Sequence, residues 1–67
     1  FARDVYRLLD RVDEDLRHVF LLQFAYDMSH KEIAQALNIS ENNVAVRLHR
    51  AKKKLADLLV KEGFVGA

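Results

Sequence analysis

The C-terminal third of the chain carries one apolar stripe with the spacing of an α-helix. Its members are Val44, Leu48, Ala51, Leu55, Leu58 and Leu59. Steps of mostly three and four residues place these side chains on one side of a helix. Ser40 suits the N-cap and Gly63 the C-terminal stop, so we predict a helix from about residue 41 to residue 61 or 62. Helices in small proteins owe most of their stability to packing, so the rest of the chain must cover this stripe.

Two segments near the N-terminus also have helical patterns. Residues 2–12 place four apolar side chains on one face: Val5, Leu8, Leu9 and Val12. Residues 14–27 follow Asp13, whose carboxylate can cap a helix, and they are apolar on almost all sides. A helix of that kind is usually buried on most sides. We therefore expect this second segment to be the central strut of the fold, with Phe24 and Tyr26 among its buried residues.

A short helix precedes the long one. Ser29 and Glu32 have the spacing of a capping box, in which each side chain accepts a hydrogen bond from the other residue's backbone N–H. The apolar residues that follow share one face: Ile33, Ala34 and Leu37. Asn38 can adopt the left-handed conformation that ends a helix, and Ile39 is the apolar residue of the turn. The two helices and their turn, about residues 30–62, predict a helix-turn-helix.

The composition is typical of a small helical domain. The 67 residues include no Pro and no Cys, and 51% of them are hydrophobic while 31% are charged. We predict one domain over residues 1–67 with an all-α fold, a four-helix bundle that contains the helix-turn-helix. Because the chain starts at Phe1 and not at Met, we expect it to be a fragment of a longer protein. Phe64 and Val65 either fold back on the bundle or mark where that longer chain was cut.

Other chemistries fit these residues poorly. Three His and no Cys do not give the ligand spacing of a zinc site, and residues 13–15 lack the alternation and glycine of a calcium loop. No Gly-rich phosphate loop and no set of Ser, His and acid stands out. We therefore predict no enzyme, no metal or other cofactor and no small-molecule substrate. No apolar run approaches the roughly 20 residues of a membrane span, so we expect no membrane partner and a cytoplasmic location.

Positive charge is concentrated in the last predicted helix. Residues 1–29 hold four basic and six acidic residues, whereas residues 30–67 hold seven basic and four acidic ones. Five of those seven basic residues lie between Arg47 and Lys54. An asymmetry of this kind indicates a face that binds a polyanion.

The side of this helix that points away from the apolar stripe has the residues of a DNA-reading surface. The side chains that we expect to enter a major groove are Asn42, Asn43, Val46, Arg47 and Arg50. Asparagine reads adenine and arginine reads guanine through paired hydrogen bonds, and an outward valine suits a thymine methyl group. The lysines that follow suit phosphate contacts: Lys52, Lys53 and Lys54.

Two motifs are specific enough to indicate a family. They are Ser29-His30-Lys31-Glu32-Ile33-Ala34 and Arg47-Leu48-His49-Arg50-Ala51-Lys52-Lys53-Lys54-Leu55, within a likeness that covers about residues 8–56. The chain here resembles region 4 of bacterial sigma factors of the sigma-70 family, especially the small extracytoplasmic-function (ECF) group. In that family the domain is a four-helix unit that recognises the minus-35 element of promoter double-stranded DNA through the second helix of its motif.

The resemblance also implies partners and two further contacts. In the family this domain docks on the flap of the RNA polymerase β subunit, and anti-sigma proteins can sequester it. Carried over by position, the resemblance adds His49 to the base-reading face and makes Lys31 a phosphate contact.

The chain departs from the family pattern at three places. The family commonly has Pro where Asp13 stands, and Gly-Thr-Val where this chain has residues 42–44. A basic residue followed by Ser is usual where this chain has Ala45 and Val46. These departures leave the expected fold unchanged and bear on the expected base preference and affinity.

Two alternatives to promoter reading stay open. A sigma-like bundle can bind polymerase or an anti-sigma factor without touching DNA, and the uncharged pair Ala45 and Val46 favours this alternative. The effector domains of LuxR-type response regulators share the turn at residues 31–34, but their last helix tends to read Val-x-x-His. Here Val44 is followed by Ala45-Val46-Arg47, so the pattern favours the sigma family.

Overall fold

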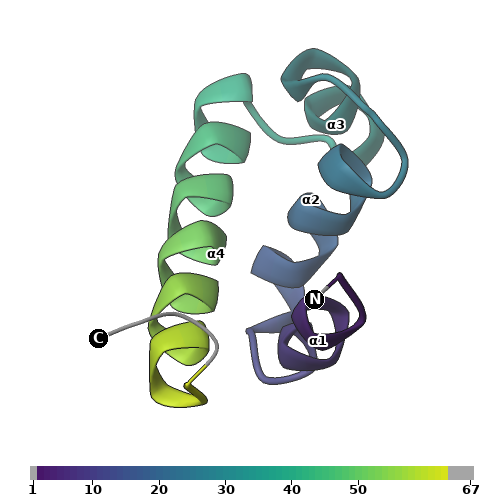
Figure 1. Cartoon of the computed structure of the whole chain (residues 1–67). Coiled ribbons are helices and arrows are strands. Elements are labelled where there is room, and N and C mark those ends of the chain that lie inside the picture. The colour runs from purple at the N-terminus through teal and green to yellow at the C-terminus, as the bar shows by residue number, and fades with distance from the viewer. Residues whose placement is uncertain (1, 64–67) are drawn as a thin grey trace.

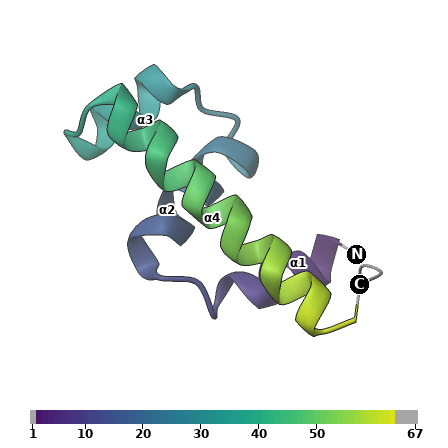
Figure 2. The same cartoon turned by 90° about the vertical axis from the view of Figure 1, so that its left-hand side faces the viewer.

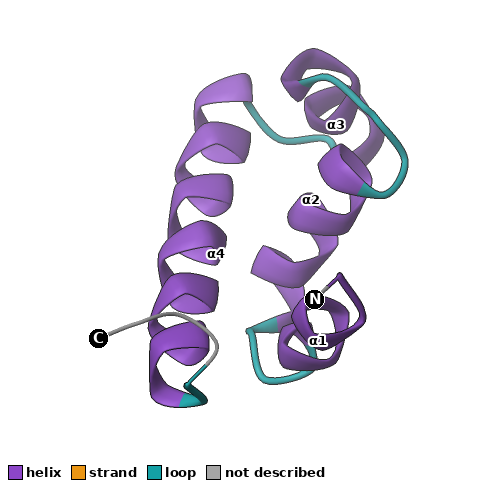
Figure 3. Cartoon of the chain, in the orientation of Figure 1, coloured by secondary structure: helices purple, strands orange, loops and turns teal. Residues whose placement is uncertain are grey.

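The computed structural model describes residues 2–63, which form four helices and no strand. The helices are α1 (Ala2–Leu9), α2 (Glu14–Phe24), α3 (His30–Leu37) and α4 (Glu41–Lys61). Helix α4 runs along one side of the molecule, with α3 near its N-terminal end and α1 near its C-terminal end (Figures 1 and 2). Short loops join the helices (Figure 3). The predicted all-α fold with a helix-turn-helix is confirmed. Phe64 and Val65, with their two alternative roles, lie outside the described residues.

The apolar stripe of α4 is divided between two clusters of the hydrophobic core. In the first cluster, Leu55 and Leu58 pack with the buried side chains of α1 and the following turn: Leu8, Leu9 and Val12. In the second cluster, Val44 and Leu48 pack with side chains of α2 and α3: Val19, Ile33 and Ala34. Ala51, between the two sets, is also fully buried. The apolar stripe of α4 therefore contributes side chains to both clusters of the core, as its spacing predicts.

Helix α1 ends three residues earlier than the pattern predicts. The backbone N–H of Arg11 bonds to the carbonyl of Leu8 at 2.9 Å, and that of Val12 bonds to the carbonyl of Leu9 at 3.0 Å. Such three-residue steps tighten the last turn and let the chain leave the helix direction. Val12 still enters the core, with 3% of its surface exposed. The predicted apolar face is right, although the helix that carries it is shorter.

The predicted cap of α2 by the Asp13 carboxylate is wrong. Asp13 does occupy the N-cap position, but its side chain accepts no hydrogen bond from the helix. Its backbone carbonyl accepts from the N–H of Arg17 at 2.9 Å, which begins the helical ladder. The Asp13 side chain thus contributes only its negative charge beside the positive end of the helix dipole, together with Glu14 and Asp15.

Helix α2 is less buried than its apolar sequence predicts. Val19 is its one fully buried residue, whereas Phe24 is 50% exposed and Tyr26, beyond the helix end, is 72% exposed. The helix ends at Phe24 and not at residue 27, because the chain turns there with Asp27 at a positive φ of 56°. A domain of this size has too few neighbouring elements to cover every side of a helix.

The Phe24 ring is partly covered from two sides. Its centroid lies 4.6 Å from that of Phe20, and the ammonium group of Lys52 lies 5.3 Å from it. At the far end of the bundle, an ion pair between Arg11 and Glu62 joins the turn after α1 to the end of α4. The contact between Lys52 and Phe24 links α4 to α2, and the ion pair between Arg11 and Glu62 links the end of α4 to the turn after α1.

Candidate nucleic-acid interface

The entry into the helix-turn-helix is fixed by the predicted capping box. The backbone N–H of Glu32 donates to the Ser29 hydroxyl at 3.1 Å, and the N–H of Ser29 donates to the Glu32 carboxylate at 2.9 Å. The bond from the backbone N–H of Ser29 is the main reason that the pKa of Glu32 lies below its ordinary value of 4.5. The negative charge also suits the positive end of α3. The start of α3 is therefore tightly defined.

The turn between α3 and α4 sets the direction of the second helix. Asn38 ends α3 in the left-handed conformation with φ 57°, as predicted, and the N–H of Ile39 bonds to the carbonyl of Ala34 at 3.0 Å. Ser40 then caps α4, since its hydroxyl accepts from the N–H of Asn43 at 3.0 Å. Val44 is the first α4 side chain inside the core. The small side chain of Ala34, buried in the same cluster, lets α4 approach α3 closely.

The structure divides the six predicted base-reading residues into two groups. Four of them are exposed on the first half of α4: Asn42, Val46, His49 and Arg50. The other two, Asn43 and Arg47, are half-buried and contact each other. Val46 is 38% exposed, and an outward position is compatible with its predicted role at a thymine methyl group.

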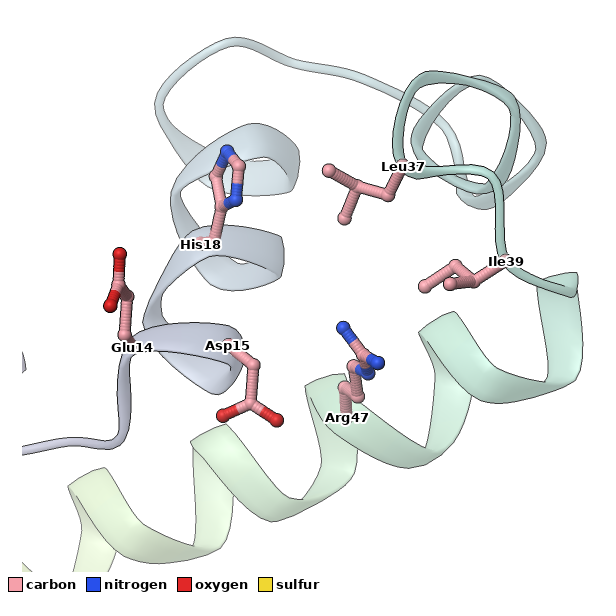
Figure 4. Close-up of a pocket in the computed structure, with 6 residues that line it drawn as sticks. All are labelled: Glu14, Asp15, His18, Leu37, Ile39 and Arg47. Atoms are coloured by element: carbon pink, nitrogen blue, oxygen red, sulfur yellow. The ribbon is translucent and has the colours of Figure 1, made fainter.

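Arg47 lies on the side of α4 that faces α2. Its Nε–H donates to the Oδ1 atom of Asn43 at 3.0 Å. Its side chain reaches toward an open depression of about 560 Å³, shown in Figure 4. The other side chains that line this depression come from α2, from α3 and from the turn: Glu14, Asp15, His18, Leu37 and Ile39. Two carboxylates, those of Glu14 and Asp15, thus line the same depression as the Arg47 side chain. Arg47 therefore has protein surroundings that Val46 and Arg50 lack.

The predicted phosphate-binding lysines also differ in their surroundings. Lys52, Lys53 and Lys54 are all exposed, but the Lys52 ammonium lies over the Phe24 ring. Among residues 2–63, no aromatic ring lies under the ammonium group of Lys53 or Lys54 in this way. Lys31, also exposed, lines a shallow depression beside the start of α4 with Gln35, Asn38 and Glu41 among its neighbours. Basic groups thus lie beside the start of α4, at Lys31, and in the middle of the helix, at Lys53 and Lys54.

Two other kinds of site are not found in the described part of the chain. Among residues 2–63, no group of three or more His, Cys, Asp or Glu side chains is placed to hold a metal ion. Within the same residues, no helix has both the length and the apolar character needed to cross a membrane.

Comparison with known proteins decides the family. Residues 2–55 match the family described as "Sigma-70, region 4". The chain belongs to the sigma-70 region 4 family. A curated relative of this sigma domain is the ECF RNA polymerase sigma factor SigX of Bacillus subtilis (strain 168), which is 40% identical over 54 residues. Those residues are 81% of this chain and 28% of SigX, so the chain spans less than a third of that relative. No solved structure matches the sigma domain.

The family assignment confirms the resemblance to region 4 of an ECF sigma factor. The roles of the individual residues in DNA binding stay predictions. The hydrogen bond between Asn43 and Arg47 was not predicted, although their spacing of four residues allowed it. The contact of Lys52 with Phe24 was not predicted either, and no local spacing indicates it because the two residues lie on different helices.

Proposed function

We propose that this sigma domain binds promoter DNA and reads the minus-35 element with the first half of α4, while it is docked on the β flap of RNA polymerase. The observation that carries the proposal is the exposed polar face of α4 in a chain of this family. The side chains of that face are exposed and do not belong to the hydrophobic core. A helix held in this way fits the width of a major groove.

In this mechanism phosphate contacts position the domain and base contacts specify the sequence. Lys53 and Lys54 neutralise phosphates on one side of the groove, and Lys31 does so on the other side. Each neutralised phosphate releases a counterion. The logarithm of the binding constant therefore falls by roughly 0.9 for each phosphate contact when the salt concentration rises tenfold. To bind a phosphate, Lys52 would have to give up its contact with the Phe24 ring. We therefore expect Lys52 to contribute less to DNA affinity than Lys53.

Base reading falls to the exposed residues of the same face. Arg50 can donate two hydrogen bonds to the O6 and N7 atoms of guanine, and Val46 can pack on a thymine methyl group. Asn42 at the start of the helix can pair with adenine. Each good paired contact distinguishes its base by about 1–3 kcal/mol.

The activity is therefore binding and not catalysis. A single small module makes few base contacts, so we expect weak binding by the domain alone and useful affinity only together with polymerase in the cytoplasm. An anti-sigma factor that covers the exposed face of α4 would then block promoter reading.

The direct test is selection of bound duplexes from a random DNA pool by the protein in the presence of RNA polymerase core. We expect enrichment of one short motif, with an affinity that falls steeply as salt is raised. Enrichment of no sequence would contradict the proposal. Selection by polymerase core without the protein is the control for background binding.

A second candidate function is binding of a protein partner without DNA. The exposed aromatic side chains at the end of α2, Phe24 at 50% and Tyr26 at 72%, favour it, because exposed aromatic groups are enriched at protein interfaces. A salt titration of binding to random duplex DNA separates the two functions. A slope near zero would favour the protein partner, whereas a steep slope supports DNA binding.

A further inference from the structure

Val46 lies at the centre of the exposed face of α4. It is 38% exposed, and the polar residues one turn before and one turn after it, Asn42 and Arg50, are exposed as well. Residues four positions apart are neighbours on a helix surface, so these three side chains form one row. The other large apolar side chains in the first half of this helix, Val44 and Leu48, are buried in the core. Val46 is therefore an apolar position within a row of hydrogen-bonding groups.

The side chain of Val46 is short and stiff. A valine in a helix has one strongly preferred rotamer, so its two methyl groups point in a fixed direction. The neighbouring Ala45 is also exposed and adds no long side chain beside it. An arginine such as Arg50 extends much further from the helix, so a base edge meets Val46 only where a group projects into the groove. Val46 thus offers such a group a small apolar surface without any hydrogen-bonding atom.

One apolar group projects from the base edges of the major groove, namely the methyl group on C5 of thymine. The modified base 5-methylcytosine carries the same group on the same ring atom, whereas cytosine and uracil have a hydrogen there. The two methylated bases differ in the hydrogen-bonding group on C4, which an apolar side chain cannot detect. Val46 should therefore respond to the methyl group and not to the identity of the base.

We propose that Val46 binds the C5-methyl group of a pyrimidine, so that methylation of a cytosine at this base pair strengthens promoter binding. The inference rests on the proposed function, because it requires the exposed face of α4 to enter a major groove. Transfer of one methyl group out of water corresponds to about fourfold in affinity. We expect this factor for thymine over uracil and for 5-methylcytosine over cytosine at the same base pair.

The test uses modified duplexes of the sequence that the protein selects together with RNA polymerase core. Each thymine is replaced singly by deoxyuridine, and the affinity of the complex is measured by fluorescence anisotropy. We expect one thymine at which the loss of its methyl group weakens binding about fourfold. At that same base pair, a duplex with 5-methylcytosine should bind about fourfold more tightly than one with cytosine.

Two variants assign this methyl dependence to Val46. Val46→Ala removes both methyl groups of the side chain, so the ratio of affinities between the thymine and the uracil duplex should fall close to one. The fold should tolerate the change, because Val46 is outside the core and alanine favours a helix. Val60→Ala is the matched control. It removes the same atoms from a valine that is 44% exposed in the second half of α4, and the ratio should stay at about four.

The outcomes separate the inference from the function on which it rests. A wild-type protein that enriches no sequence with polymerase overturns the proposed function and this inference with it. A selective wild type with a ratio close to one at every thymine overturns the inference alone. The same conclusion follows if the wild-type ratio persists in Val46→Ala. Circular dichroism of each variant shows whether the helices are intact, so a loss of fold is not mistaken for a loss of methyl dependence.

Discussion

Arg50 and Val46 are one helical turn apart on the exposed side of α4. Four residues of α-helix rise by about 6 Å, so in the proposed complex the two side chains would reach different base pairs. The arginine can make paired hydrogen bonds, whereas the valine can make only an apolar contact. Most of the discrimination by this face should therefore depend on Arg50.

Replacement of Arg50 by Ala tests this at the level of one residue. We expect a loss of about 1–3 kcal/mol in binding to the preferred sequence, together with relaxed specificity at one base pair, because a paired contact to guanine disappears. Fluorescence anisotropy with the selected duplex and its single-base variants measures both effects. Unchanged binding and unchanged base preference would show that α4 is not the reading helix.

Replacement of Lys53 by Ala should have a different signature. Lys53 is exposed and is predicted to contact a phosphate, so its loss should weaken binding to all sequences alike. The plot of log affinity against log salt should flatten by about one unit, because one counterion fewer is released. Lys52→Ala is the matched comparison on the neighbouring residue, and we expect a smaller change there. An equal loss in both variants would argue against the Phe24 contact as a restraint on Lys52.

Residue exposure on α4 could be predicted from the sequence, but side-chain pairing could not. The helical period alone predicts that Val46 and Arg50 point outward, and the structure places both on the exposed side. It does not predict that Arg47 turns toward α2, because that depends on Glu14 and Asp15 lying across from it in the fold. Contacts between distant segments are absent from a pattern that is read along the chain.

At the scale of the helices, local signals predicted the motif closely. Ser29, Glu32 and Asn38 occupy the capping and stop positions that their chemistry favours, because caps depend on neighbours in sequence. The prediction was wrong for α2, whose apolar sequence suggested burial on most sides. The exposure of Phe24 depends on how many other helices surround α2, and the sequence of α2 alone does not reveal how many there are.

The capping box makes the stability of α3 depend on pH. The pKa of Glu32 is lower in the folded protein than its ordinary value of 4.5, so the ionised form stabilises the fold. This contribution is present above the unfolded pKa and is lost as the pH falls through the folded pKa. We expect the urea midpoint of the wild type to decrease on acidification below about pH 4.5.

Glu32→Gln is the control for this pH dependence. Glutamine keeps the hydrogen bond of a capping box and does not titrate. The difference in urea midpoint between wild type and variant should therefore be present at neutral pH and vanish in acid. A difference that stays constant from pH 7 to pH 3, followed by circular dichroism, would contradict a role for the Glu32 charge.

At the scale of the whole molecule, the two core clusters should unfold together. Leu9 belongs to the first cluster and Leu48 to the second, and each side chain is at most 2% exposed. Leu→Ala at such positions costs about 2–5 kcal/mol, a large part of the stability of a small domain. We expect Leu9→Ala and Leu48→Ala each to lower the melting temperature of the entire domain in one transition.

Two probes distinguish joint from separate unfolding. Far-ultraviolet circular dichroism reports all helices, while tyrosine fluorescence reports Tyr6 in α1 and Tyr26 after α2. Coincident curves support one cooperative unit. Two separate transitions in either variant would mean that the clusters are independent, and that the shared stripe of α4 does not couple them.

The uninterrupted length of α4 restricts how such a domain can change during evolution. Its 21 residues extend about 31 Å, and the same helix carries the half with the proposed reading face and the half that packs on α1. One residue inserted between Leu48 and Leu55 would turn one half by about 100° relative to the other and take its apolar side chains out of the core. If the outer face reads promoters as proposed, a new specificity is therefore expected to arise by substitution on that face, while the length of this segment stays constant.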